Sequence, residues 1–328
     1  MATVAVITPI YATSENKRLE LFEYTLRSVL RQNSSNCGIV HVVVDDGSTV
    51  DVEGLLKEHG DGRTRYVRRE RSPDDLKTAS NALNMGIDYC LERSGDVFTK
   101  EEADNLYGIT FVHSDDLLAR NSVEVRLETL SNGFVYTDMG LLNKKGKVIG
   151  VRSGDTLDKM NASQFNIFLF NYHTVMWKYD FLQYLKDFVG AKYEQPGVFD
   201  PQLYFGEDTD MVLSSIEAAA HRNYEALYLN EVSVLYRVHE QSISGESLDS
   251  LSLNAQHKRI YQKHFKGEIK NSKLELLAML QADPPWSWFI FLSKDVKIKL
   301  KPIKYYVKGL TFKFQHPLLV RSLEQQLI

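Results

Sequence analysis

Short apolar runs rich in β-branched residues alternate with amphipathic segments over the first 120 residues of the chain. The runs with strand character are residues 3–8, 38–44, 64–68 and 107–112. The segments with helical periodicity are residues 15–32, 51–59 and 77–92. In the first of these, one helix face carries Leu19, Phe22, Leu26, Val29 and Leu30. Strands that alternate with helices predict parallel strands joined by crossover helices, so we expect an α/β fold.

The pattern changes after about residue 134. Residues 134–151 are typical of a hairpin, with its turn near Gly146. An apolar run and an amphipathic helix from Tyr179 follow, and residues 198–219 indicate a loop that leads into another helix. Strand-like segments then continue to about residue 244. We expect these elements to extend the first sheet into one domain.

Acidic pairs follow two of the predicted strands. Asp45 and Asp46 come directly after the second strand, and Asp115 and Asp116 come shortly after the fourth. Because ligands of such sheets bind at the carboxyl ends of the parallel strands, both pairs are expected at one edge. Adjacent carboxylates repel each other, and a divalent cation bound to them relieves that repulsion. The pattern therefore indicates a cation site at this edge.

The composition excludes several classes of protein. With 328 residues, 43% of them apolar and 25% charged, the chain has the usual composition of a globular protein with a large core. A formal net charge of −4 argues against a nucleic-acid partner. Cys37 and Cys90 form no CxxC pair, which favours a reducing, cytosolic setting. The N-terminus lacks signal-peptide features, and no apolar run reaches the roughly 18 residues of a membrane-spanning helix.

Six motifs within residues 3–244 resemble those of family-2 glycosyltransferases with the GT-A fold. In chain order they are ITPIY, VVVDDGS, ALNMGI, FVHSDDLL, FDPQLYFGEDTD and YRVHEQSIS. Each motif alone is a weak match, whereas their order and spacing together are specific. The resemblance implies a Rossmann-like, mostly parallel sheet flanked by helices, and sugar transfer from a nucleotide-sugar donor. The catalytic domain would span residues 1–245, with the donor bound by residues 1–120 and the acceptor side formed by residues 121–245.

The resemblance gives HSDD a metal-binding role. The second Asp of the family's usual Asp-x-Asp motif binds Mn²⁺ or Mg²⁺ and matches Asp115, while His113 stands at the first position. His239 resembles a His that completes the metal shell in several members, and imidazole suits Mn²⁺. Ser114 and Asp116 are expected beside the donor. The alternative is that Asp116 or Ser114 only caps the following helix.

The same resemblance assigns VVVDDGS to the nucleotide. Asp46 is expected to accept a hydrogen bond from the ring N–H of uracil, which selects a UDP-sugar, with Asp45 close by. Pro9 and Tyr11, in the loop after the first strand, are expected to flank the base. Asn84 of ALNMGI belongs to the same donor set. An Asp-Gly turn without a ligand, and a Tyr11 packed in the core, are the alternatives.

One departure from the family pattern concerns the donor. Leu83 stands where the family often has Arg in an Ala-Arg-Asn motif. Arg68, Arg69 and Arg71 follow the third predicted strand and are candidates to replace that charge. His113, in place of the first Asp of the metal motif, leaves the donor geometry open.

GEDTD has the most direct catalytic role in this resemblance. Asp208 matches the general base, which takes the proton of the acceptor hydroxyl as that oxygen attacks the anomeric carbon. A single base implies direct displacement with inversion. Glu207 and burial are expected to raise the pKa of Asp208. The alternative is a group of acidic residues that favours the first helical turn. Asp210 is expected at the surface or behind the site.

The C-terminal extension, residues 246–328, is expected to be helical, basic and aromatic. From Trp286 onward, eight Lys or Arg and two Asp or Glu give a net charge of +6, which leaves −10 for the rest of the chain. Residues 286–316 interleave lysines with aromatic residues, which fits a segment in an anionic membrane interface. The alternative is a helical subdomain packed on the core or on another subunit. Many family members act on lipid-linked acceptors, which implies a cytoplasmic protein at the inner face of the cell membrane.

Three other functions are alternatives to a transferase of this kind. A sugar nucleotidyltransferase also has a parallel sheet and acidic metal ligands, but residues 8–19 lack its glycine-rich phosphate loop. A dehydrogenase is disfavoured because no GxGxxG follows the first strand. A membrane-docked scaffold without turnover is the non-enzymatic alternative. The sugar, the acceptor, the linkage and the oligomeric state do not follow from these motifs.

Overall fold

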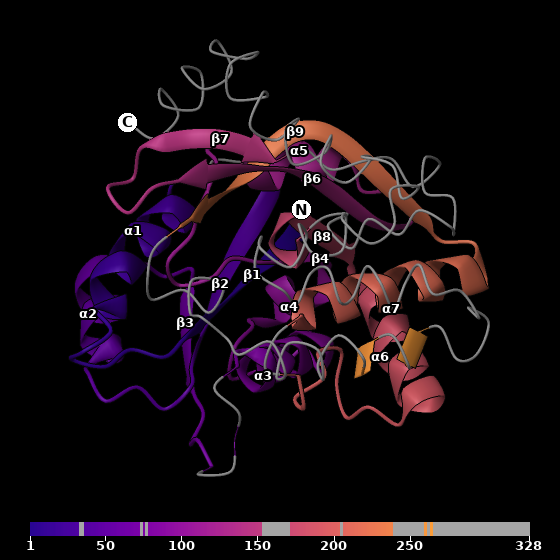
Figure 1. Ribbon diagram of the computed structural model, residues 1–328, viewed down its shortest axis with the longest axis horizontal. Helices are drawn as coiled ribbons and strands as arrows, with labels where there is room; N and C mark the ends of the chain where they lie inside the picture. The colour runs from indigo at the N-terminus through magenta and orange to yellow at the C-terminus, as the bar shows by residue number, and fades with distance from the viewer. Residues whose placement is uncertain are drawn as a thin grey trace, which may run out of the picture.

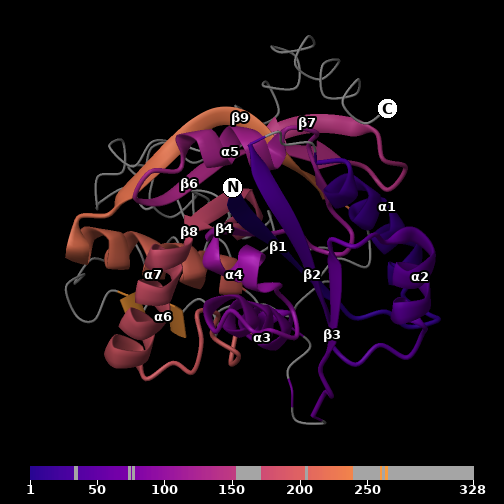
Figure 2. The ribbon, with the colours of Figure 1, turned by 180° about the vertical axis from the view of Figure 1, so that it is seen from behind.

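The computed structural model describes residues 1–32, 36–72, 75, 78–152, 171–203, 206–238, 259–260 and 263–264. Nine strands of this described part form one sheet with helices on both faces (Figures 1 and 2). The strands are β1 (Ala2–Ile10), β2 (Cys37–Asp45), β3 (Thr64–Arg68), β4 (Leu106–Phe111), β5 (Leu117–Leu118), β6 (Gly133–Leu142), β7 (Val148–Arg152), β8 (Val175–Lys178) and β9 (Glu225–Arg237). The helices are α1 (Arg18–Leu30), α2 (Val52–His59), α3 (Ser80–Leu91), α4 (Lys100–Asp104), α5 (Ser122–Thr129), the 3₁₀ helix η2 (Tyr172–Thr174), α6 (Tyr179–Tyr193) and α7 (Glu207–Arg222).

The sheet combines a parallel half with a mixed half. Its order is β3-β2-β1-β4-β8-β6-β9-β5, with β7 paired to β6. The first four strands run parallel to one another, and β8 then pairs antiparallel to both β4 and β6. β9 runs parallel to β6 and antiparallel to β5. The predicted α/β fold is confirmed, and the four parallel strands are those that the sequence pattern predicts.

The alternation along β1 divides the core into two layers. Ala5 and Ile7 point to one face, where they join a large cluster with α3, α6 and α7. Val4 and Val6 point to the other face and pack with residues of α1 and α5. All four side chains are fully buried, as expected for a central strand covered by helices on both sides.

The hairpin predicted from residue 134 is present as β6 and β7. Its turn contains Gly146, whose φ of +78° is a conformation that glycine adopts without steric cost. The main-chain N–H of Gly146 donates to the carbonyl of Asn143 at 2.9 Å. The turn therefore lies where the sequence predicts it.

Two sets of long-range contacts bring the ends of several strands and helices together at one edge of the sheet. Leu117 of β5 pairs with Leu235 of β9, so the end of β9 lies beside the loop after β4. The 3₁₀ helix η2 precedes β8, the neighbour of β4, and contacts both β4 and α7. This edge therefore holds the ends of β1, β2, β4 and β9 together with the start of α7.

Candidate active site

Asp45, the last residue of β2, serves the structure of the turn. Its side chain is fully buried and accepts hydrogen bonds from Ser48 N–H at 2.8 Å and from the Tyr66 hydroxyl at 2.7 Å. Arg68 lies 3.1 Å from the same carboxylate. Gly47 has a φ of +79°, as the tight turn requires. Asp45 thus holds the Asp-Gly-Ser turn and the end of β3.

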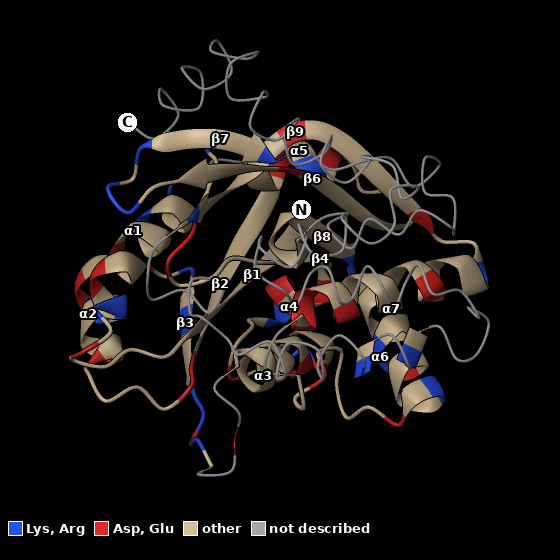
Figure 3. Ribbon diagram, in the orientation of Figure 1, with Lys and Arg blue, Asp and Glu red and all other residues tan. Residues whose placement is uncertain are grey.

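Asp46, the next residue, faces two arginines. Arg69 forms an ion pair with it, and Arg71 Nη1 lies 3.7 Å from its second oxygen. Burial raises the pKa of Asp46, although the charge of Arg69 opposes the shift. Both arginines belong to the chain after β3, whose mixed charges are visible in Figure 3. The candidates for the missing family Arg therefore lie at the predicted nucleotide site.

Tyr11 lies beside this pair of arginines. It is 39% exposed, so the alternative of a core-packed ring is wrong. The Arg71 guanidinium stands 4.7 Å from the ring centroid, a cation–π distance. An exposed aromatic ring, a buried carboxylate and two guanidinium groups together suit a nucleoside base and its phosphates.

Pro9 lies inside β1 and not in a loop, which corrects the expectation from sequence. Its side chain is buried, and its Cα is paired with that of Val44 in β2. The ladder between β1 and β4 ends at Ile7. A proline is tolerated at position 9 because β1 has no partner strand there on the β4 side.

The side chain of Asn84, in α3, forms two hydrogen bonds with the main chain of Phe199. Its amide nitrogen donates to the Phe199 carbonyl at 2.8 Å, and its amide oxygen accepts from the Phe199 N–H at 2.9 Å. A pocket of about 440 Å³ lies beside it, with Arg69 and Asp75 also in its wall. Arg69 forms ion pairs with both Asp46 and Asp75, so this pocket adjoins the predicted nucleotide site. The predicted contact of Asn84 with the donor stays a prediction.

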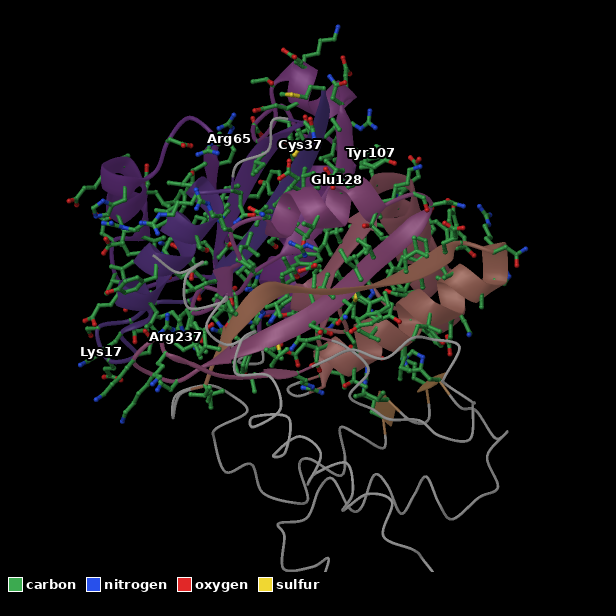
Figure 4. The ribbon with its side chains drawn as sticks, turned by 90° about the horizontal axis from the view of Figure 1, so that it is seen from above. Lys17, Cys37, Arg65, Tyr107, Glu128 and Arg237 are labelled. Atoms are coloured by element: carbon green, nitrogen blue, oxygen red, sulfur yellow. The ribbon has the colours of Figure 1, made fainter. Side chains whose placement is uncertain are left out.

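The second acidic pair lies in the loop between β4 and β5. Asp115 is 6% exposed and forms an ion pair with Arg18 at the start of α1. Asp116 is 1% exposed, and one of its oxygens accepts from Arg237 N–H at 2.8 Å. Figure 4 shows Lys17 and Arg237 on the same side of the molecule, where α1 begins and β9 ends.

Neither acidic residue of this loop caps α5. The N-cap residue of α5 is Asn121, which makes no side-chain cap bond, so the capping alternative is wrong for Asp116 and Ser114. The second oxygen of Asp116 is buried without a hydrogen bond among the described residues. Burial and the charge of Asp115 raise the pKa of Asp116 well above its usual value. Ser114 is buried beside them.

Two residues that the sequence analysis did not single out, Tyr172 and His173, contact the loop between β4 and β5. Tyr172, in η2, makes a short hydrogen bond with the ring of His113. His173 is 3% exposed, and its Nδ1 lies 3.4 Å from the free oxygen of Asp116. Burial lowers the pKa of His113 to about 4 and that of His173 well below its usual value, so both rings are neutral at pH 7.

Glu207 and Asp208 form the first turn of α7. Gly206, the N-cap residue, has a φ of +83° and gives the helix no side-chain cap. The acidic residues do stand in the first helical turn, as the alternative expects, so the catalytic role of Asp208 stays a prediction. Burial, followed by the charge of Asp208, raises the pKa of Glu207 to about 8. Burial also raises the pKa of Asp208, while the charge of Arg152 and a 2.7 Å hydrogen bond from Thr209 N–H oppose the shift.

The hydroxyl of Tyr172 is influenced by the charges of Asp115 and Asp116 and of Glu207 and Asp208. It is 1% exposed, and the pKa of its hydroxyl is raised well above the usual value by burial. The charges of Glu207, Asp208, Asp116 and Asp115 raise it further, in that order. Since η2 contacts both β4 and α7, Asp115 and Asp116 after β4 and Glu207 and Asp208 of α7 lie at the same edge of the sheet.

The loop after β4 is chemically suited to a divalent cation. It offers adjacent carboxylates, one of whose buried oxygens has no hydrogen bond among the described residues. Oxygen ligands of this kind are those that Mg²⁺ and Mn²⁺ prefer. No group of three or more His, Cys, Asp or Glu side chains with metal-site geometry occurs in the described ranges. The carboxylates of Asp115 and Asp116 would therefore share a cation with ligands from elsewhere, such as donor phosphates.

Comparison with known proteins identifies the family. The family model for Glycosyl transferase family 2 matches residues 5–177, more than half of the chain. The chain belongs to glycosyltransferase family 2. It is therefore a glycosyltransferase, an enzyme that transfers sugars. The matched residues contain the end of β1, the pairs Asp45–Asp46 and Asp115–Asp116, and Tyr172, whereas Glu207 and Asp208 lie beyond them. The alternative of a sugar nucleotidyltransferase is not supported.

Solved structures share the GT-A fold of this glycosyltransferase. TarS of S. aureus, residues 1–349, superposes with a TM-score of 0.53 and 15% identity, covering 98% of this chain and 83% of that one. The same TarS fragment in complex with UDP gives a TM-score of 0.53 and 16% identity over the same shares. The mannosyltransferase PcManGT from Pyrobaculum calidifontis, in complex with GDP-Man and Mn²⁺, gives 0.47 and 16%, covering 99% and 83%. The search of curated proteins gives no match.

Some predictions for this glycosyltransferase lie outside the described residues. These are the metal ligand His239, the domain boundary at residue 245 and the segment 286–316. No helix of the described part is long and apolar enough to cross a bilayer. Asp210 is fully buried and ion-paired, so of its two expected positions the surface is wrong and a position behind the site remains.

Sequence reasoning missed Arg18, Tyr172 and His173. Arg18 had a local signal, because a basic residue in the first turn of a helix opposes the helix dipole and so calls for an anionic partner. Tyr172 and His173 precede a short apolar strand and carry no motif. Their partners lie about 60 residues away in sequence, so only the pairing of β8 with β4 brings them to the site.

Proposed function

We propose that this enzyme is an inverting, metal-dependent glycosyltransferase that moves a sugar from a UDP-sugar to a hydroxyl of a glycan. The observation that carries the proposal is that η2 contacts both β4 and α7, which brings Glu207 and Asp208 to the sheet edge that holds Asp115 and Asp116. Burial raises the pKa of both Glu207 and Asp208, which suits a general base. A base and a cation site on either side of one space are what direct displacement of a nucleotide requires.

The donor nucleotide would lie at the ends of β1 and β2. Asp46 would accept the ring N–H of uracil, and Tyr11 would stack on the base. Arg69 and Arg71, which now neutralise Asp46, stand close enough to turn to the diphosphate. The UDP found in the TarS complex is a precedent for this donor class in the same fold.

Asp115 would hold a divalent cation, with Asp116 beside it and His239 as a further candidate ligand. The ion, Mn²⁺ or Mg²⁺, would neutralise charge on the phosphate oxygens of the leaving nucleotide. Arg18 balances the charge of Asp115 in the protein alone. The hydrogen bond from Arg237 N–H to Asp116 keeps the loop in place for this role.

Asp208 would act as the base. Its carboxylate takes the proton of the acceptor hydroxyl while that oxygen forms a bond to the anomeric carbon and the bond from this carbon to the UDP oxygen breaks. The pKa of Glu207, at about 8, leaves Glu207 protonated at pH 7. One proton on the pair lets Asp208 stay ionised next to its neighbour, because two adjacent buried charges would repel each other.

The acceptor would be a growing, lipid-linked glycan of a cell-surface polysaccharide or glycoprotein. This part of the proposal rests on the basic, aromatic segment 286–316, whose composition suits an anionic membrane surface. The enzyme would then work in the cytoplasm at the inner face of the cell membrane. A second, non-catalytic function is not favoured by any observation at the site.

Calorimetric titration with UDP-glucose, UDP-galactose, UDP-N-acetylglucosamine and the matching GDP-sugars tests the donor and the metal together. We expect one UDP-sugar to bind with Mn²⁺ and to bind far more weakly with EDTA. Asp115→Ala should remove the effect of Mn²⁺, whereas Asp180→Ala, a change of an acidic residue in the first turn of α6, should not. Equal binding with Mn²⁺ and EDTA would contradict metal dependence, and tighter binding of a GDP-sugar would contradict the role of Asp46.

A further inference from the structure

Four described residues from the C-terminal part of the chain contact the segment that leads into α7. Arg259 forms an ion pair with Asp200 at 3.0 Å. Ile260 is 5% exposed and forms a small apolar cluster with Leu203 and Leu213. Arg259 and Ile260 therefore contact residues that precede and follow Asp208, the proposed base, in the sequence.

Ile260 also lies against the main chain directly before Glu207. A Cβ atom added at Gly206 would come within 2.8 Å of Cδ1 of Ile260. Gly206 has a positive φ and is the N-cap residue of α7. The side chain of Ile260 therefore packs closely against one side of the start of α7.

Lys263 and His264 extend this contact into the first turn of α7. The Nζ atom of Lys263 lies 2.6 Å from Oδ2 and 2.8 Å from Oδ1 of Asp210, and Nε2 of His264 lies 2.9 Å from Oδ1. Nδ1 of His264 lies 3.2 Å from Oε1 of Glu217, which follows Asp210 by seven residues in the same helix. The side chains of Asp210 and His264 are fully buried, and that of Lys263 is 10% exposed.

The three carboxylates of this helical turn, Glu207, Asp208 and Asp210, have pKa values shifted in opposite directions. Burial raises the pKa of both Glu207 and Asp208. Burial acts on Asp210 in the same direction, yet the hydrogen bond from His264 and the charge of Lys263 outweigh it and lower the pKa of Asp210. The contacts with His264 and Lys263 thus favour the ionised form of Asp210, in contrast to Glu207 and Asp208.

We propose that Lys263 and His264 are positioning residues, which lock the first turn of α7 through Asp210 and thereby hold Asp208 in its catalytic orientation. The inference rests on the proposed function of Asp208 as the base. Asp210 follows Asp208 by two residues, and its N–H donates to the carbonyl of Gly206 at 2.9 Å. A shift of Asp210 therefore moves the whole turn. Misplacement of a catalytic group by about 1 Å costs up to about a hundredfold in rate.

The first test compares Lys263→Met and His264→Gln with the wild type and with Lys192→Met. Lys192 is the matched control because it also pairs with a carboxylate of α7, Glu217, but at 2.8 Å near the far end of the helix. Release of UDP is measured from the UDP-sugar chosen by calorimetry, with p-nitrophenyl glycosides as acceptors. We expect kcat to fall about tenfold to a hundredfold in the first two variants, with the KM for the donor unchanged within about twofold.

The pH profile separates positioning from a general loss of structure. If the turn loosens, water reaches Glu207 and Asp208, and their raised pKa values fall toward the ordinary range. The acidic limb of kcat should then move to lower pH in Lys263→Met and His264→Gln, but not in Lys192→Met. Lys263→Arg keeps the charge and should restore most of kcat.

A readout on the unaltered protein keeps the inference testable if a variant does not fold. Burial lowers the pKa of His264, but its bonds to Asp210 and Glu217 outweigh this and raise it. The stabilisation from His264 is therefore complete below its unfolded pKa and is lost as the pH rises through the raised value. Asp210, Glu217, Tyr193 and Lys263 are the titratable groups that face it. Hydrogen exchange of residues 206–212 should accelerate in this pH range more than that of α6.

The possible results are distinct. In one result, Asp208→Asn loses turnover, while Lys263→Met and His264→Gln both keep a normal kcat and an unshifted pH profile. That result overturns the positioning role alone. Turnover in Asp208→Asn overturns the proposed base and with it the inference. Equal exchange in the two helices at every pH, or a fall in melting temperature without a change in kcat, shows that the contact is only structural.

Discussion

Locally unfavourable residues mark the site at the scale of single side chains. Lys17 has a φ of +48°, uncommon for a residue with a side chain, and Arg18 follows it at the start of α1 against the helix dipole. Glu207 and Asp208 crowd two carboxylates into one turn. Such conflicts between local preference and structure concentrate at functional sites. The acidic residues were predictable because they are adjacent in sequence, whereas Arg18 acquires its meaning from Asp115, 97 residues away.

Asp208→Asn should abolish sugar transfer and leave donor binding almost unchanged. The amide keeps the shape of the carboxylate but cannot take a proton from the acceptor hydroxyl. The loss expected for removal of a general base is about 10²- to 10⁴-fold in kcat. Turnover is measured by UDP release, and donor binding by calorimetry. Asp187→Asn in α6 is the control, and normal turnover by Asp208→Asn would show that another group is the base.

Glu207→Gln should stabilise the protein at pH 9 and not at pH 5. Burial, followed by the charge of Asp208, raises the pKa of Glu207 in the folded protein to about 8, above its ordinary value of 4.5. The unfolded chain therefore loses this proton first, and the protein loses stability as the pH rises from about 4.5 to 8. Glutamine has no proton to lose in this pH range, so the variant does not undergo this loss of stability.

Thermal melts at the two pH values measure the effect of Glu207→Gln. The melting temperature at pH 9 should rise by roughly 2–4 °C for each kcal/mol recovered. Glu53→Gln, on the exposed side of α2, should show no such pH dependence. A rise of equal size at pH 5 and pH 9 would mean that the pKa of Glu207 is not raised in the folded protein.

At the scale of elements, the parallel half of the sheet and the β6–β7 hairpin follow from sequence. Period-two alternation and helical spacing are local signals, and they place β1, β2, β3 and β4 within one or two residues of their bounds. The pairing of β9 with both β6 and β5, and the insertion of β8 next to β4, are long-range choices that local patterns do not encode. These pairings bring Arg237 and Tyr172 to the site, which is why those contacts were not predicted.

Asn84→Ala should destabilise the protein by about 1–3 kcal/mol, because it leaves the buried N–H and carbonyl of Phe199 without partners. Asn105→Ala, which removes an exposed hydrogen bond to the Glu101 carbonyl, is the control and should cost little. Urea titration measures both. Unchanged stability together with weaker UDP-sugar binding would instead support the donor contact predicted for Asn84.

At the scale of the whole molecule, charge is distributed unevenly along the chain. Residues up to 285 carry a net −10 and the remainder +6. The lysines and aromatic residues of the basic remainder suit an anionic surface, which is the partner proposed for it. Such a role would hold the enzyme beside a lipid-linked acceptor without altering the site itself.

Replacement of five tail lysines by glutamine tests this role, since each contributes about 1 kcal/mol at an anionic membrane surface. The replaced residues are Lys294, Lys297, Lys299, Lys301 and Lys304. Affinity for vesicles that contain phosphatidylserine should fall more than about a hundredfold, and wild-type binding should weaken as salt rises. Replacement of Lys144, Lys145 and Lys147 in the hairpin turn controls for general charge, and UDP-sugar binding should be unchanged in both variants. Equal vesicle binding by all three proteins would show that the segment packs on protein, because its lysines would then contribute nothing at the membrane.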